Sequence, residues 1–191
     1  MTEKKFNPAK LDILNNPQRL SDIPPDYIWQ KLNMKKPETL VDIGAGTGFF
    51  SIPFLDYTQN GRVFACDTSD IMLQWMTDHV APEHPGIIPV KMEETMVPLK
   101  DRCADLVFMI NLHHELEAPE KILDESFRIL KNKGKIFIVD WKKEASVPGP
   151  PQTLRYRPEK VQAQIDKAGF ENVNSFHEMI KHFLVIGEKN N

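Results

Sequence analysis

A short apolar run that passes through an acid into three alternate glycines constrains the fold of this chain most. Residues 41–48 read Val-Asp-Ile-Gly-Ala-Gly-Thr-Gly. The apolar residues before the glycines predict a buried parallel strand, and those from Phe49 to Leu55 predict the inner side of the next element. Glycine between them permits positive φ and lets a ligand approach the main chain without meeting a Cβ. We therefore expect a bulky ligand at the carboxyl edge of this strand.

The rest of the chain alternates between predicted strands and predicted helices. Strands are predicted near residues 39–43, 63–66, 87–90, 106–110 and 136–139, and helices near 47–57, 70–79, 120–130 and 159–168. The cations and glycine of residues 131–134 predict the end of the third helix. Such alternation is typical of a doubly wound α/β fold, with a mostly parallel sheet and helices on both faces. Two further runs, 171–178 and 182–186, are too close for a helical crossover, so we expect an antiparallel hairpin.

The length of 191 residues suits a single structural unit with a substantial core. Five prolines break residues 1–37, where we expect a helical cover segment with one helix near 27–32. The remainder, residues 38–191, is expected to form the main domain.

Composition and charge exclude several classes of protein. The net charge of -3 supplies no basic field, so nucleic acid is not an expected partner. No apolar run has the length of a membrane span and the N-terminus lacks the apolar centre of a signal peptide, so we expect a cytoplasmic protein. Two cysteines, Cys66 and Cys103, form neither a disulfide framework nor a four-cysteine zinc site, and no metal is predicted.

The glycine spacing separates two kinds of nucleotide ligand. Dinucleotide sites use Gly-x-Gly-x-x-Gly, whereas this chain has Gly-x-Gly-x-Gly. Asp42 also stands two residues before the first glycine, where a carboxylate disfavours a pyrophosphate and suits a cationic ligand. A tight structural turn is the alternative interpretation. The stretch resembles the first motif of class I S-adenosylmethionine-dependent methyltransferases, in which this acid serves the methionine end of the cofactor.

Residues from about 38 to 141 resemble the ubiquinone/menaquinone-biosynthesis-like methyltransferases, and the ends of the chain resemble them in architecture. The resemblance implies a Rossmann-like sheet of seven strands that ends in an antiparallel hairpin. It implies S-adenosylmethionine as cofactor and S-adenosylhomocysteine as product. The cofactor-binding residues that it implies are Asp42, Gly44, Ala45, Gly46, Gly48, Asp67, Thr68, Met72, Glu93, Glu94 and Asn111.

Three acids and a methionine divide the expected cofactor contacts. Asp67 ends the second strand about 20 residues after the glycines, where an acid can accept hydrogen bonds from ribose hydroxyls. Capping of the next helix is the alternative for Asp67, and core packing is the alternative for Met72, which otherwise faces the adenine. Glu93 and the backbone N–H of Glu94 are expected at the adenine, although Met92 replaces a more usual glycine there. Solvated charge is the alternative for both glutamates.

Candidate catalytic residues follow the fourth and fifth predicted strands, at the edge that overlooks the ligand. The main chain of Asn111 is expected at the methionine moiety. His113 or His114 is expected to face the cofactor, where a histidine can take a proton during methyl transfer. Structural packing and metal binding are the alternatives for the two histidines. Asp140, after the fifth strand, is the third candidate catalytic residue.

Three further residues are candidates for the acceptor pocket. Trp141 is expected to line it, and Arg155 and Tyr156 are expected to contact an anionic substrate. Solvated charge is the alternative for the arginine. The stretch from Val147 to Pro151 is proline-rich and suggests a rim or lid.

The predicted function is methyl transfer to a small-molecule acceptor. The sequence Asn-Leu-His-His after the fourth strand differs from the Asn/Asp-Pro-Pro-Tyr/Phe of enzymes that methylate amino groups of bases. One alternative is a binding module that holds the cofactor without catalysis. Another is an NAD(P)-dependent reductase, suggested by the spacing of Tyr156 and Lys160, although Pro158 between them favours a helix start over a continuous helix.

Overall fold

The computed structural model describes residues 11–144 and 149–190. Three short helices come first: α1 (Leu11–Leu14), α2 (Gln18–Asp22) and α3 (Pro25–Leu32). The helix predicted at 27–32 is confirmed as α3 and begins earlier, at Pro25, because proline suits a first helical position whose N–H has no partner. The predicted rim residues 147 and 148 lie outside the described residues.

The described residues form one seven-stranded sheet, which confirms the predicted fold class. Its strands are β1 (Thr39–Ile43), β2 (Arg62–Asp67), β3 (Ile87–Lys91), β4 (Ala104–Ile110), β5 (Leu130–Trp141), β6 (Glu171–Phe176) and β7 (His182–Glu188). Their order is β3-β2-β1-β4-β5-β7-β6. Within this sheet β7 runs antiparallel to both neighbours, and the strands from β3 to β5 are parallel. The final pair is the expected hairpin.

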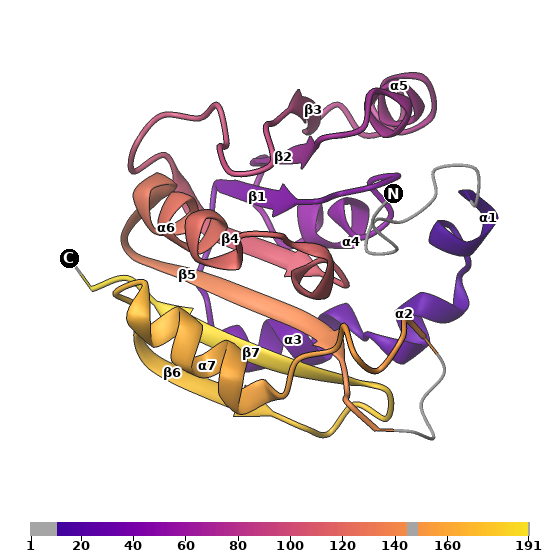
Figure 1. Cartoon of the computed structure of the whole chain (residues 1–191). Coiled ribbons are helices and arrows are strands. Elements are labelled where there is room, and N and C mark those ends of the chain that lie inside the picture. The colour runs from indigo at the N-terminus through magenta and orange to yellow at the C-terminus, as the bar shows by residue number, and fades with distance from the viewer. Residues whose placement is uncertain (1–10, 145–148, 191) are drawn as a thin grey trace.

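Helices cover both faces of the sheet (Figure 1). They are α4 (Ser51–Leu55), α5 (Asp70–His79), α6 (Pro119–Ile129) and α7 (Pro158–Lys167), with a 3-10 turn η1 (His113–Glu115) after β4. On the face of α3 and α4, Phe54 packs against the stacked rings of Phe108 and Phe137, with ring centroids 4.9 and 5.2 Å away. On the face of α6 and α7, aliphatic side chains of both helices pack on the sheet. Among the described residues, none of the helices combines the length and the apolar character that crossing a bilayer requires.

Two predicted boundaries are wrong, and both errors involve positive φ. The helix predicted from 47 begins only at Ser51, because Gly48 has a φ of 76° that no helical turn accepts. Residues 131–134 do not end α6 but belong to β5, where the pairing with β4 shifts register. There the left-handed residue is Lys133, with a φ of 64°, and not Gly134.

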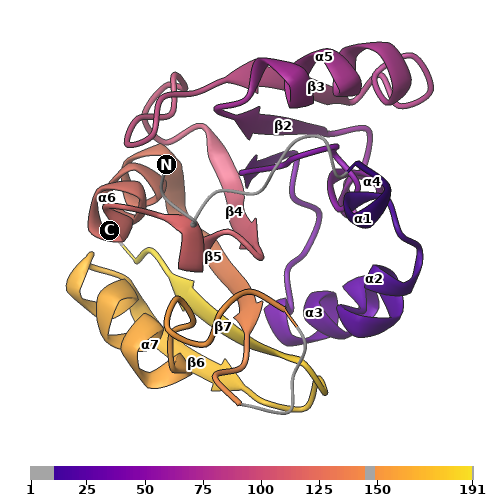
Figure 2. The same cartoon turned by 45° about the vertical axis from the view of Figure 1, so that its right-hand side comes forward.

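The carboxyl ends of the parallel strands face the N-terminal helices. In Figure 1 the arrowheads of β1 and β4 point to the side of the molecule where α1 and α2 lie. Figure 2 shows α1, α2 and α3 together on one side of the molecule, away from α6 and α7. This edge carries the glycine turn after β1 and the loops after β2, β4 and β5. In a parallel α/β sheet, ligands bind outside these ends.

Candidate functional site

The turn after β1 forms a cradle of main chain. Gly44, Gly46 and Gly48 all have positive φ, between 57° and 76°. The N–H groups of Gly44 and Ala45 donate to the Cys66 carbonyl at 2.8 and 3.0 Å, which fixes the turn to β2. A Cβ on Gly44 would lie 2.6 Å from the Leu112 side chain, so this position has no room for one. A Cβ on Gly46 would lie 3.6 Å from the Leu14 side chain, an ordinary van der Waals contact, so the end of α1 covers the backbone there.

Asp42 lies buried at the end of β1, beneath this cradle. Its Oδ2 accepts a hydrogen bond of 2.6 Å from the Ser51 hydroxyl of α4. Burial raises the pKa of Asp42 to about 7, against the opposing effect of the Ser51 bond, and the nearby Asp67 raises it further. A cation bound beside Asp42 would stabilise the ionised form of this buried carboxyl. The nearest such charge is the Arg19 guanidinium of α2.

Asp67 connects the glycine cradle to the start of α5. Its two carboxylate oxygens accept hydrogen bonds of 2.8 Å from the N–H groups of Gly46 and Ser69. Ser69 precedes α5, so part of the capping alternative for Asp67 is present in the structure. Each carboxylate oxygen has two lone pairs, and the Asp67 carboxylate therefore retains acceptor capacity for ribose hydroxyls. Thr68, beside it, is exposed.

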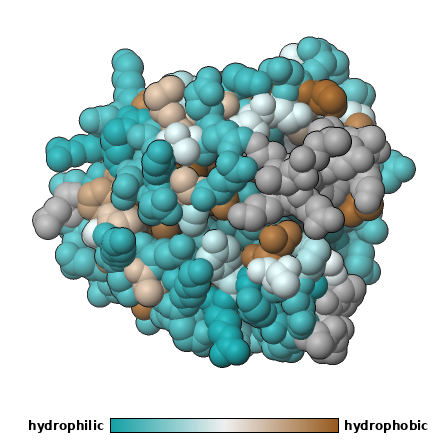
Figure 3. Space-filling view, viewed as in Figure 1, coloured by the Kyte–Doolittle hydropathy of each residue, from teal (hydrophilic) through white to brown (hydrophobic). Residues whose placement is uncertain are grey.

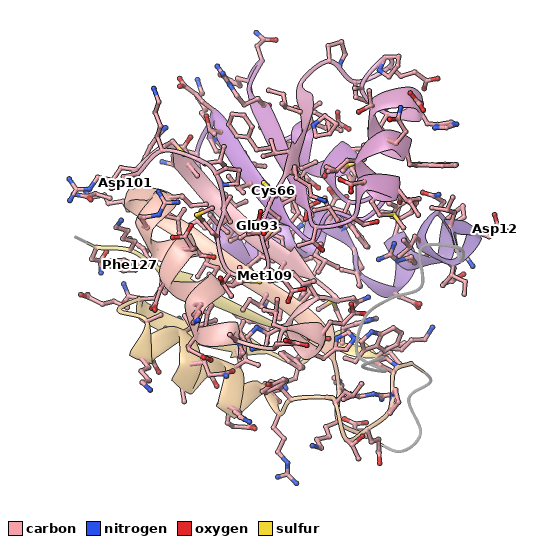
Figure 4. All side chains as sticks on the ribbon, turned by 45° about the horizontal axis from the view of Figure 1, so that its top comes forward. Asp12, Cys66, Glu93, Asp101, Met109 and Phe127 are labelled. Carbon is pink, nitrogen blue, oxygen red and sulfur yellow. The ribbon has the colours of Figure 1, made fainter. Side chains whose placement is uncertain are left out.

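The residues expected near the adenine lie beside the end of β2. Met72 of α5 is buried. The N–H of Met92 donates to the Asp67 carbonyl at 3.1 Å, and Glu93 and Met96 form a small turn whose mutual hydrogen bonds place both glutamates at the surface. Figure 4, in which Glu93 and Cys66 are labelled, shows them in the same region. Because Met92 does not take positive φ, the more usual glycine is not required here.

Two buried polar atoms beside the cradle have no hydrogen-bond partner within the described ranges. They are the Thr47 hydroxyl oxygen and the Asn111 side-chain oxygen. Asn111 has a φ of 57°, and its N–H donates to the Val139 carbonyl at 2.8 Å, so its position between β4 and β5 is fixed. Leaving such atoms unpaired costs about 1 to 3 kcal/mol each. Three glycines in the cradle and two unpaired polar groups fit a polar ligand that lies across the loops after β1 and β4.

His113 turns toward α7. Its Nε2 lies 3.0 Å from the Gln164 side-chain oxygen, and its ring meets Tyr156 edge-on with centroids 5.1 Å apart. Burial lowers its pKa, so the ring is neutral at pH 7. This contact with α7 corresponds to the structural-packing alternative for His113.

His114 and Asp140 form a buried pair between η1 and the end of β5. His114 Nδ1 donates to Asp140 Oδ1 at 2.8 Å, and its backbone N–H donates to Oδ2 at the same distance. Burial disfavours the charged ring, but the bond and the charge of Asp140, together with Glu115, outweigh it and raise the pKa of His114. With Nδ1 committed to the carboxylate, Nε2 is the ring atom that can exchange a proton, and it lies 3.6 Å from a Glu115 carboxylate oxygen.

The three candidate substrate residues lie together, but their side chains already have partners. The Trp141 ring packs on His182, with centroids 4.3 Å apart, and Gly149 lies against its other edge. Arg155 donates to the carbonyls of Pro150 and Lys142 at 2.8 and 3.0 Å. These contacts make Arg155 a tether for the loop after β5, and its expected contact with an anionic substrate finds no support in this geometry.

Tyr156 also bears on the reductase alternative. It precedes α7, and the Lys160 ammonium lies over its ring, 4.5 Å from the centroid. The two side chains therefore do not project side by side from one helix, as a reductase would require.

The sequence left three residues of this region unrecognised. Ser51 holds Asp42, Arg19 lies beside it, and His182 is buried with neither ring nitrogen hydrogen-bonded to a described residue. Burial lowers the pKa of His182 to about 4. Ser51 carried a signal, as a polar residue within the apolar run after the glycines. Over residues 11–144 and 149–190, no group of three acidic, histidine or cysteine side chains is placed to hold a metal ion.

This fold and site define a class. A glycine cradle between a buried acid at the end of β1 and a second acid at the end of β2, on a sheet with an antiparallel seventh strand, is the arrangement of S-adenosylmethionine-dependent methyltransferases. Residues 41–138 match the model of the family described as "Methyltransferase domain". The chain belongs to this family, and its cofactor is S-adenosylmethionine.

Individual relatives differ in the group that their names say they transfer and in what they act on. A crystal structure of a SAM-dependent methyltransferase from Aquifex aeolicus is 30% identical, with a TM-score of 0.90 over 96% of this chain and 99% of that one. A tRNA(Phe) (4-demethylwyosine(37)-C(7)) aminocarboxypropyltransferase from Methanocaldococcus jannaschii is 31% identical over 52% of this chain and 38% of its own length. A malonyl-[acyl-carrier protein] O-methyltransferase from Methylococcus capsulatus is 28% identical over 52% and 36%. The chain thus matches less than two fifths of these two curated relatives.

Proposed function

We propose that this protein transfers the methyl group of S-adenosylmethionine to a small-molecule acceptor. The observation that carries the proposal is the glycine cradle with one buried acid beneath it and a second acid bonded to it at Gly46. The bound cofactor supplies a methyl group on a sulfonium that is already activated. The protein then has to orient the two reactants, and orientation alone can lower the barrier by about 7 to 11 kcal/mol.

In this proposal, residues at the ends of different strands contact different parts of the cofactor. Asp42 and the main chain at Asn111 hold the methionine end, where the unpaired Asn111 oxygen supports a polar contact. Asp67 accepts from the ribose hydroxyls with its remaining lone pairs. Met72 and Glu93 flank the adenine.

A buried proton acceptor supports a small acceptor rather than a polymer. His114 is only 5% exposed, so only a slender part of a molecule reaches its Nε2. The net charge of -3 disfavours a polyanion. Hydrophilic residues cover most of the coloured surface seen in Figure 3. We propose that the pair of His114 and Asp140 takes the proton that a hydroxyl, amine or enolic carbon loses on methylation. Asp140 holds the ring in the tautomer whose Nε2 carries no proton and can accept one, beside the Glu115 carboxylate at 3.6 Å.

The substrate class is tested by following the label from methyl-tritiated S-adenosylmethionine. The protein is incubated with a low-molecular-weight cell extract, with bulk tRNA, or with total protein that includes acyl carrier protein, and each fraction is counted. We expect label in the small-molecule fraction and background counts in the two polymers. Label in tRNA or protein alone would overturn the small-molecule acceptor, while transfer in none of the three would favour a binding module.

The proposed ribose contact is tested by Asp67→Ala. This variant is expected to weaken S-adenosylhomocysteine binding by about 1 to 3 kcal/mol in a calorimetric titration. Adenine alone lacks the ribose, so its binding should fall only by the effect of any distortion of the cradle. Ser69→Pro keeps the Asp67 carboxylate but removes the Ser69 N–H that donates to it, together with the hydroxyl, and gives an upper limit for that distortion. Unchanged affinity in Asp67→Ala would exclude the contact.

A further inference from the structure

Arg19, on α2, brings a cation to the carboxyl end of β1. Its guanidinium lies 4.8 Å from the ring centroid of Phe50 and 5.3 Å from that of Phe49, the two residues that follow the glycine cradle. Its Nη1 donates to the Leu14 carbonyl at the end of α1. The Leu14 side chain in turn is the nearest neighbour of Gly46. The end of α1 and Arg19 therefore rest directly on the cradle.

The guanidinium is held there at a cost. Burial lowers the pKa of Arg19 to about 10, and the charge of Asp42 acts in the opposite direction. The group stays charged at pH 7, but it has exchanged much of its water for aromatic rings and one carbonyl. A guanidinium has five N–H donors in a fixed plane. Among its contacts with the described residues, one of these donors makes a hydrogen bond.

The methionine end of the cofactor carries one positive and one negative charge, which are opposite in sign to those of Asp42 and Arg19. It carries an ammonium and a carboxylate on one carbon, so a site that orders it has to offer an anion and a cation close together. Asp42 and Arg19 are such a pair: they interact electrostatically, and Arg19 packs on the two phenylalanines that follow the cradle. Arginine suits a carboxylate particularly well, because two parallel N–H groups match its two oxygens.

We infer that Arg19 binds the carboxylate of the methionine moiety of S-adenosylmethionine while Asp42 receives the ammonium. This inference rests on the proposed binding mode at the cradle. It gives residues 1–37, the expected cover segment, a part in cofactor recognition. Arg19 lies outside residues 41–138, which match the family model, so the matched stretch carries no sign of it.

A competing role for Arg19 is purely structural. In that role the guanidinium neutralises Asp42 and packs on Phe50, and the cofactor never touches it. The two roles differ in what they predict for a ligand without a carboxylate. A direct contact matters only when the ligand has that group, whereas a packing role affects every ligand of the cradle alike.

The test is a calorimetric double comparison with two ligands and three variants of the full chain. The ligands are S-adenosylmethionine and its decarboxylated form, which keeps the ammonium and the sulfonium. The variants are Arg19→Ala, Arg19→Lys and, as a matched control, Arg62→Ala, which removes an exposed arginine at the opposite end of β2. Circular dichroism and urea unfolding of each variant establish that it is folded before titration.

We expect Arg19→Ala to weaken S-adenosylmethionine binding about 10- to 100-fold and to change binding of the decarboxylated ligand less than twofold. Arg19→Lys, which keeps the charge without the paired donors, should fall between, and Arg62→Ala should match the wild type. Equal losses for both ligands would overturn the inference and leave the packing role. Wild-type protein that binds neither ligand would instead refute the proposed cofactor site, so the two failures are distinguishable.

Discussion

Asp42→Asn is expected to make the ligand-free protein more stable and the cofactor complex weaker. The Asp42 carboxyl is buried, and its pKa lies near 7 in the folded protein against 3.8 for an ordinary aspartate. A raised pKa means that the folded protein favours the protonated carboxyl. Its contribution to stability is full below pH 3.8 and is lost as the pH rises through 7. Asparagine is neutral throughout and keeps an oxygen to accept from Ser51.

The size of the effect follows from these two pKa values. A difference of about 3 pH units corresponds to about 4 kcal/mol over the whole range, at about 1.4 kcal/mol per unit. Between pH 5 and pH 8 the wild type should lose about 2 to 3 kcal/mol that Asp42→Asn keeps. Urea unfolding of both proteins at the two pH values, without ligand, measures this difference directly.

Ser51→Ala is the matched control, with the opposite sign. The Ser51 hydroxyl stabilises the ionised carboxylate, so its removal should cost more at pH 8 than at pH 5. In the same samples, Asp42→Asn should bind S-adenosylmethionine at least 10-fold more weakly, because the ammonium loses its carboxylate. The reasoning is refuted if Asp42→Asn destabilises the free protein equally at both pH values, or if it binds the cofactor like the wild type.

Three further substitutions test other parts of the structure. In Gly44→Ala the new Cβ would lie 2.6 Å from the Leu112 side chain at a φ of 72°. The free energy of unfolding in urea should therefore fall by about 1 to 3 kcal/mol, and adding Leu112→Ala should restore part of it. Full stability of the single variant would contradict the cradle geometry. His114→Gln should slow methyl transfer. In the wild type the rate should rise with pH, with a midpoint above 6.5, because the neutral ring accepts the proton and the pKa of His114 is raised. The variant should lose this rise, and an unchanged pH profile would exclude the histidine from the reaction. Lys189→Met should cost about 1 to 3 kcal/mol, because the buried ammonium donates to two carbonyls at the end of α6 and the start of β5, whereas the exposed Lys121→Met should cost almost nothing.

Local sequence patterns were sufficient to predict the sheet. The buried strands contain short apolar runs that mark them, and the strong run at 106–110 falls within β4, which begins two residues earlier. The helix 159–168 was predicted to within one residue at each end, because Pro158 fixes its start and Gly169, with a φ of 95°, its end. These signals act between neighbours in the chain, so a single sequence contains them.

The boundaries that were missed depend on contacts between distant residues. The start of α4 depends on a cradle tied to the Cys66 carbonyl of the adjacent strand, which outweighs the helical spacing after it. Lys133 takes the left-handed conformation because its N–H donates to the carbonyl of Lys189, more than 50 residues later. Neither contact leaves a mark on the local pattern.

The residues of the candidate site also fall into two groups, those that a local sequence pattern marks and those that only contacts between distant residues bring together. Asp42, the glycines and Asp67 could be proposed from the sequence because their spacing along β1 and β2 is characteristic. Arg19 was missed because no local pattern marks an arginine within a short helix, and only the packing of α2 on Phe50 brings it to Asp42. The pairing of His114 with Asp140 likewise appears only once β4 and β5 lie side by side.

The central claim is that the cradle after β1 holds S-adenosylmethionine and not a dinucleotide. Parallel calorimetric titrations of the purified chain with S-adenosylhomocysteine and with NADH test it most directly. We expect one S-adenosylhomocysteine to bind each chain, with no heat of binding from NADH. Saturable binding of NADH, with none of S-adenosylhomocysteine, would contradict the account.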